Sequence, residues 1–145
     1  MKIRSFNEQV YKQVISNPAT IATGTLPASY IDVSNFERFV INIAYGASDG
    51  VFDAQVVQAT AAAGTGSKNI TGAAITQLSA TDDNKQVTIE VQTDQLDIAN
   101  GFRYVAVTFT AAGTTTGYAE LLGFSPRHVP VTQPAAYAEA VQVAG

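Results

Sequence analysis

His128 and Ser125 are the first candidates for chemistry, because a serine and the single histidine of the chain lie three residues apart in GFSPRHVP. This spacing suggests a hydrolase. The stretch lacks the second glycine of a nucleophile elbow, however, and Pro126 would obstruct the helix that follows such a serine. One histidine is also a poor zinc site, because zinc takes several nitrogen or sulfur ligands. We therefore predict neither a catalytic nor a metal site here.

Acidic side chains offer a second chemistry, either as glycosidase carboxylates or as calcium ligands. Aspartate is also common in turns, where its side chain accepts hydrogen bonds from nearby backbone N–H groups. The stretch DDNK lacks the spaced ligands and the distal glutamate of a calcium loop. We interpret the acidic pairs as turn residues: Asp49/Asp53, Asp82/Asp83 and Asp94/Asp97.

The stretch AAAGTGSKN (residues 61–69) superficially resembles a phosphate-binding loop. The Walker pattern requires Gly-Lys-Ser/Thr between a buried strand and a helix, whereas here Ser67 precedes Lys68 and strands are expected on both sides. We predict a mobile loop. No cofactor site is expected anywhere in the chain.

Composition excludes several classes of protein. The 145 residues include no Cys, which rules out disulfides and thiolate metal sites. Eight Lys and Arg against twelve Asp and Glu, without a basic run, disfavour binding along a nucleic-acid backbone. The hydrophobic residues occur in short runs, so no membrane span is predicted. MKIRSFNEQVYKQ turns polar where a signal peptide would be apolar, so export by that route is not expected.

Alternating apolar residues predict strands, and therefore an all-β fold, an antiparallel β-sandwich or jelly roll. The pattern is clearest between residues 37 and 124, where turns separate the alternating runs. In each run alternate residues share one face, and Val87, Ile89 and Val91 are expected to point inward. The other sets that share a face are Phe39, Ile41 and Ile43; Phe52, Ala54 and Val56; Val105, Val107 and Phe109; and Ala119 and Leu121.

Turn residues predict which strands are neighbours. Asp49-Gly50 in ASDG is a hairpin signal, so the runs on either side should pair, and AAGTTTG (residues 111–117) should close a second hairpin. A short strand is expected at about Ala74 to Leu78. The best helix candidate is AAYAEAVQ after Pro134, which could equally be an extended tail.

The chain is predicted to be one folded unit with two extended arms. We expect an N-terminal arm with short strands over residues 1–34, a β-sandwich core over 35–125 and an extended C-terminal tail over 126–145. The N-terminal arm has an alternative reading, as the first strand of its own sandwich.

Two stretches, LDIANGFRYVAVTFT and LLGFSPRHVPVTQP, resemble the C-terminal half of capsid decoration (cement, head-stabilising) proteins of tailed bacteriophages. DGVFDAQVVQ and TDDNKQVTIEVQ resemble the middle of the same proteins, so the resemblance covers about Phe36 to Pro134. Ala106 differs from this group, in which that position is often basic, and neither terminal segment has a counterpart in it.

The resemblance implies a non-enzymatic virion protein, made in the bacterial host cytoplasm, that binds the capsid exterior as a homotrimer and braces junctions of the major capsid protein. An extended N-terminal arm is suited to adding a strand to a neighbour's sheet while its apolar side chains fill pockets. The expected contact residues are Phe6, Val10, Tyr11, Val14 and Ile15. The alternatives are another virion component, in the tail or a head fibre, and a carbohydrate-binding β-module or small β-fold hydrolase.

Overall fold

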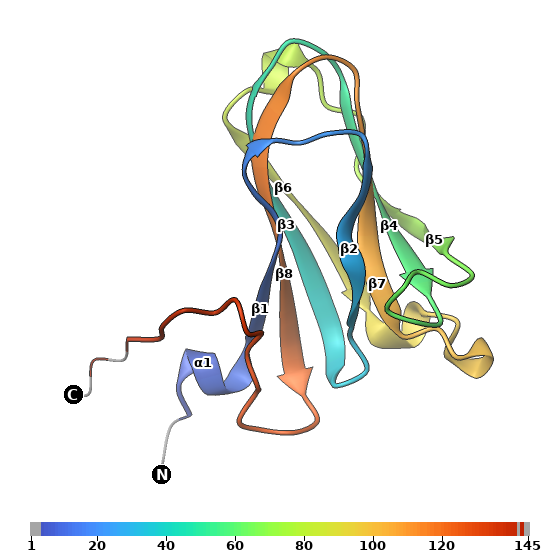
Figure 1. Cartoon of the computed structure of the whole chain (residues 1–145), viewed down its shortest axis with the longest axis vertical. Helices are drawn as coiled ribbons and strands as arrows, with labels where there is room; N and C mark the ends of the chain where they lie inside the picture. The colour runs from blue at the N-terminus through green and yellow to red at the C-terminus, as the bar shows by residue number, and fades with distance from the viewer. Residues whose placement is uncertain (1–3, 142, 144–145) are drawn as a thin grey trace.

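Eight strands form two four-stranded antiparallel sheets in the computed structural model, which describes residues 4–141 and 143 (Figure 1). The predicted all-β sandwich is therefore confirmed. The strands are β1 (Tyr11–Thr20), β2 (Gly24–Asp32), β3 (Phe36–Ser48), β4 (Phe52–Ala59), β5 (Lys68–Ala74), β6 (Lys85–Gln92), β7 (Tyr104–Ala111) and β8 (Thr115–Pro126). The helices are short: α1 (Phe6–Gln9) and the 3-10 turns η1 (Ala80–Asp82), η2 (Thr93–Gln95) and η3 (Ile98–Asn100).

Sheet A has the strand order β1-β8-β3-β6, and sheet B has the order β2-β7-β4-β5. The core lies between the sheets, and the alternating pattern correctly identifies its centre. Phe39, Ile41 and Ile43 of β3 are fully buried, as are Val105 and Phe109 of β7. Alternation gives each strand one apolar face, and burying those faces against each other drives the sheets together.

The two predicted hairpins are wrong. β3 and β4 flank the ASDG turn but belong to different sheets, and so do β7 and β8, which flank AAGTTTG. Each turn instead crosses from one sheet to the other, at the upper end of the molecule in Figure 1.

The two crossing loops bind each other, which explains why they do not close hairpins. The Asp49 N–H donates to the Thr114 carbonyl at 3.2 Å, and the Ala112 N–H donates to the Val51 carbonyl at 2.9 Å. The Asp49 carboxylate also accepts a hydrogen bond from the Thr114 N–H. The turn residues therefore satisfy one another across the two sheets.

Most of the predicted N-terminal arm belongs to the sandwich, as in the alternative reading. β1 pairs with β8 from Tyr11↔Gly123 to Thr20↔Thr116, and β2 pairs with β7. Register shifts interrupt both pairings, at two places in β1 and between Leu26 and Ile31 in β2. Extra residues in one strand break the two-residue period, which is why these strands are weakly patterned in sequence. Residues 1–3 of the predicted arm lie outside the described residues.

Three smaller features also differ from the expectations. The predicted strand at 74–78 begins earlier, as β5, which ends at Ala74; beyond it Leu78 forms an isolated bridge to Phe52. The loop before β5 is hydrogen-bonded, with the Tyr30 N–H donating to the Ala62 carbonyl at 2.8 Å. Residues 135–141 form neither helix nor strand, and residues 142, 144 and 145 of the predicted tail lie outside the described residues.

Ser79 caps η1, and the Asp82 carboxylate completes the capping box; hydrogen bonds from Lys85 and then from the Ser79 backbone and hydroxyl lower the pKa of Asp82 to about 2. Because the folded pKa is below the ordinary 3.8, the carboxylate stabilises the fold at neutral pH, and that contribution is lost as the pH falls through about 2. We expect Lys85→Ala to move the pKa of Asp82 back toward 3.8 in an NMR titration of the carboxyl carbon. A midpoint that stays near 2 in the variant would contradict the assigned cause.

Candidate interaction surface

The residues considered for catalysis or metal binding are dispersed in the structure. Ser125 and His128 are both exposed, and the His128 N–H donates to the Asn35 side chain at 3.2 Å. Within residues 4–141 and 143, no three His, Cys, Asp or Glu side chains gather as a metal site. No helix in the described part of the chain is long and apolar enough to cross a membrane.

Most of the acidic residues bind other parts of the chain, and not all of them lie in turns as interpreted, because Asp53 belongs to β4. Asp53 accepts from the Gln77 amide at 2.7 Å, and Asp83 accepts from the Ser48 N–H at 3.0 Å. Asp97 pairs with Lys68 and accepts from Asn100, which lowers its pKa. These carboxylates are oriented toward neighbouring loops.

The five predicted contact residues divide between the core and the surface. Val10 and Ile15 are 7% and 6% exposed, so they pack within the protein itself. Tyr11 is partly buried against Phe36, with ring centroids 5.3 Å apart, and burial raises its pKa. Phe6 and Val14 are 55% and 43% exposed. Of the five, these two are the ones that present a large apolar surface to a partner.

Two terminal segments, residues 6–10 and 131–137, bind each other beside β1, and we call this arrangement the terminal clasp. The Val131 N–H donates to the Glu8 carbonyl at 3.0 Å, and the Tyr137 hydroxyl donates to the Asn7 side chain at 2.9 Å. The Gln133 amide donates to the Val10 and Asn7 carbonyls and accepts from the Lys12 N–H. Figure 1 shows both segments leaving the lower end of the sandwich on the same side.

The clasp positions a surface patch formed by the exposed Phe6 and Val14 and the half-buried Lys12 and Tyr137, which we call the clasp patch. The Lys12 ammonium lies over both aromatic rings, 5.1 Å from the centroid of Phe6 and 4.9 Å from that of Tyr137. Such cation–π contacts orient exposed rings. A hollow of about 170 Å³, lined in part by Lys12, Val14 and Tyr137, lies beside them.

Gln133 is the central residue of the clasp, and Gln133→Ala removes three of its hydrogen bonds. Because residues 6–10 and 131–137 lie outside the two sheets, we expect faster amide hydrogen exchange in both segments. The free energy of unfolding should fall by only about 1–2 kcal/mol. Hydrogen exchange followed by mass spectrometry measures the first effect, and urea unfolding measures the second. Unchanged exchange in both segments would show that the clasp is held by other contacts.

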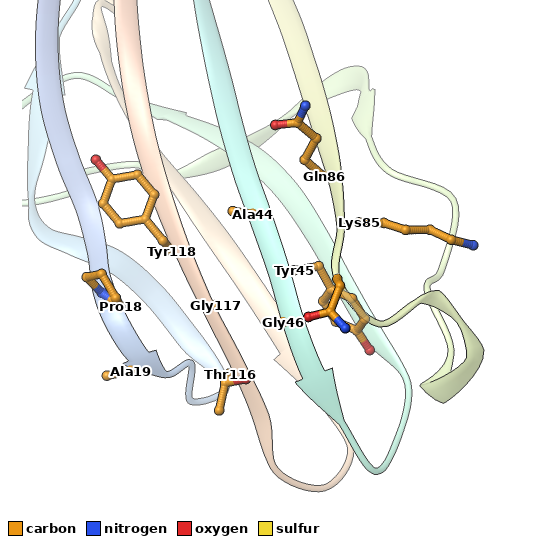
Figure 2. Close-up of a pocket in the computed structure, with 11 residues that line it drawn as sticks. Pro18, Ala19, Ala44, Tyr45, Gly46, Lys85, Gln86, Thr116, Gly117 and Tyr118 are labelled. Carbon is orange, nitrogen blue, oxygen red and sulfur yellow. The ribbon is translucent and has the colours of Figure 1, made fainter.

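A shallow groove of about 670 Å³ lies across the outer face of sheet A (Figure 2). Its lining includes Pro18 of β1, Ala44 of β3, Gln86 of β6, and Thr116 and Tyr118 of β8. Tyr118 also lines the hollow beside the clasp patch, so the two concavities meet at its ring.

Glu120 fixes the position of Tyr118. It accepts from the Tyr118 hydroxyl at 3.0 Å and from the Asn42 amide at 3.5 Å. Burial, followed by the hydrogen bond to Glu120, raises the pKa of Tyr118. The sequence analysis did not identify this groove. The available signal was the alternation of β8, which places Tyr118 and Glu120 opposite the buried Ala119 and Leu121.

No family model matches the chain, and no curated protein matches it. Among solved structures, the chain is similar to a protein whose structure is titled "Bacillus endospore appendages form a novel family of disulfide-linked pili". The two chains are 13% identical, and the TM-score is 0.40. The similarity covers 82% of this chain and 90% of that chain.

Proposed function

We propose that this protein is a non-enzymatic structural component of a virion, which binds the outside of an icosahedral phage capsid and stabilises the junctions between subunits. The resemblance carried by LDIANGFRYVAVTFT and LLGFSPRHVPVTQP supports this proposal. The structural observation that carries it furthest is the clasp patch, where Phe6 and Val14 are exposed on an ordered framework.

The clasp patch suits a contact with another protein. Exposed aromatic and aliphatic side chains gain free energy when a partner covers them, and Lys12 between two rings adds a positive charge at the same place. The framework is already ordered by hydrogen bonds, so little conformational entropy is lost on binding. The expected partner is the major capsid protein, with the decoration protein acting as a homotrimer on the capsid exterior.

Stabilisation would follow from mass action. A protein that binds only the assembled capsid lattice shifts the equilibrium away from subunit dissociation, and many copies bound to one capsid add their effects. This mechanism requires no catalytic turnover. The exposed apolar residues in the clasp patch would supply the contact, and the sandwich would hold them in place.

A binding assay with a matched pair of variants tests the proposal. Val14 and Val51 are exposed valines, at 43% and 37%, and Val51 lies in a crossing loop at the opposite end of the sandwich from α1. Purified protein is mixed with bare phage heads and sedimented, and the copies bound per head are counted. We expect saturation at about one copy per capsid subunit and more heat-resistant heads. Val14→Asp should abolish binding, and Val51→Asp should leave it unchanged.

Failure to bind any phage head would reject capsid decoration and leave the tail or head-fibre alternative. If Val14→Asp and Val51→Asp lost head binding to the same extent, the clasp patch would be rejected as the contact surface. Deleting residues 1–24 is not a useful test, because it removes β1 from sheet A.

Carbohydrate binding is a second candidate, favoured by the groove in Figure 2. An aromatic ring flanked by amide and hydroxyl groups can stack on a sugar and hydrogen-bond its hydroxyls. Tyr118, Gln86 and Thr116 supply those groups. Binding on a glycan array that is lost in Tyr118→Ala, while heads are not bound, would favour this function over capsid decoration.

A further inference from the structure

A small pocket is lined mainly by residues of the β6–β7 connection, which lies at the lower end of the sandwich in Figure 1. Its volume is about 150 Å³, and three segments that are distant in sequence build it. Ser34 follows β2, Thr93 begins η2, Phe102 and Arg103 precede β7, and Arg127 follows β8. The pocket shares no lining residue with the groove of Figure 2 or with the clasp patch.

The lining of this pocket is positively charged, although the whole chain carries a net charge of -4. It contains Arg103 and Arg127 and no acidic residue. Arg103 is partly neutralised, because its Nε lies 3.3 Å from the Asp32 carboxylate and it also donates to the Tyr104 hydroxyl. Arg127 makes no side-chain ion pair or hydrogen bond with any of the described residues. Its guanidinium is permanently charged, so its charge remains available.

Thr93 provides an independent indication of a ligand. Its side chain is 4% exposed, and among the described residues its hydroxyl is the buried side-chain polar atom that lacks a hydrogen-bond partner. Buried polar groups are nearly always paired in folded proteins, so an unpaired one requires an explanation. A hydroxyl can donate to an anionic oxygen, and Ser34 adds a second hydroxyl to the same lining.

We propose that this pocket binds one oxoanion, either a carboxylate or a phosphate group. Arg127 and Arg103 would supply charge-assisted hydrogen bonds, for which the guanidinium is geometrically suited. The Thr93 and Ser34 hydroxyls would donate to the remaining oxygens, and Phe102 would contact an attached carbon group. The volume accommodates a single such group. This site does not depend on the proposed capsid function.

An adjoining hollow of about 450 Å³ provides the matched control. It shares Thr93 and Arg127 with the pocket, but it also contains Arg38 and two acids, Glu37 and Asp94. Arg38 lies outside the proposed pocket and is paired with Glu90 at 2.9 Å. Arg38→Gln therefore makes the same change of charge nearby without altering the proposed site.

The test is a titration of the full chain with sodium phosphate and, separately, with sodium acetate, both at constant ionic strength against sodium chloride. Backbone amide NMR shifts at Thr93, Gly101 and Arg127 should change saturably with at least one of the two anions. The anion that binds more tightly shows whether the pocket prefers a phosphate or a carboxylate group. Arg127→Gln should weaken binding by roughly tenfold or more. Arg38→Gln should change it by less than about twofold.

Thr93→Val separates a binding role from a structural one. Valine has nearly the same shape and lacks the hydroxyl, so it should weaken anion binding while leaving the midpoint of urea unfolding unchanged or raised. Arg127→Lys keeps the charge and should bind with intermediate affinity, which provides a second readout if Arg127→Gln does not fold. Shifts that do not saturate, equal shifts with chloride, or equal loss in Arg38→Gln would overturn the proposal.

Discussion

Gly50→Ala is expected to destabilise the fold by about 3 kcal/mol or more, because overpacking against a fixed backbone atom is costly. A Cβ on Gly50 would overlap the carbonyl oxygen of Ala112 in the other crossing loop, and a backbone atom cannot rotate away. The two loops would have to separate. Their mutual hydrogen bonds, Ala112 N–H to Val51 and Asp49 N–H to Thr114, would then be lost.

Gly72→Ala is the matched control for this prediction. Gly72 has φ +79, and a Cβ there would meet no atom within 4 Å. This variant therefore costs only the backbone strain of a left-handed residue, about 1 kcal/mol. Urea unfolding of both variants gives the two free energies. Equal destabilisation would show that backbone conformation, rather than contact between the loops, decides the effect at Gly50.

Phe52→Ala is expected to destabilise the protein by about 3–5 kcal/mol, because it leaves a cavity at the centre of the core. Phe52 is fully buried. Its ring centroid lies 5.4 Å from that of Tyr45 in sheet A and 5.6 Å from that of Phe109 in sheet B. The ring therefore links the two sheets, and its removal weakens contacts on both sides.

Phe6→Ala serves as the control for Phe52→Ala. The same truncation at this 55% exposed ring should cost less than about 1 kcal/mol. Guanidinium unfolding, monitored by tyrosine fluorescence, measures both changes. If Phe52→Ala lowered the free energy of unfolding as little as Phe6→Ala does, the core would have repacked around the cavity.

The inner face of each central strand was predictable from sequence, because burial there follows a two-residue period. In β3, β4 and β7 the residues predicted to share one apolar face are buried, such as Ile41, Val56 and Val107, although Val57 and Ala106 of the opposite face are buried too. That period depends only on the strand's own residues and on having one face against the core. The local sequence is therefore enough to show which residues of a central strand share a face.

Strand partners were not predictable in the same way. ASDG has the composition of a hairpin turn, and the same residues also suit a crossing loop. What distinguishes the two is the contact between Asp49 and Thr114, 65 residues apart in sequence. No local pattern contains that contact.

The candidate sites depended on the same long-range information. Which residues of β1 face outward is set by its bulged pairing with β8, so Val14 and the buried Ile15 could not be separated in advance. The small pocket that contains Arg103 and Arg127 takes Thr93 and Arg103 from the β6–β7 connection and Arg127 from the segment after β8. None of these three residues was expected to bind a ligand, because only the fold brings them together.

The strand order also determines when the chain can fold during synthesis. Among the described residues, β1 pairs only with β8 and β2 only with β7, so these two strands are made before the strands that they pair with. β4 and β5 are the only paired strands of this sandwich that follow each other directly in sequence. Because domains generally fold as units as the chain emerges, neither sheet can be completed until β7 and β8 have been translated. The apolar faces of β1 to β6 must therefore avoid aggregation until those two strands are made.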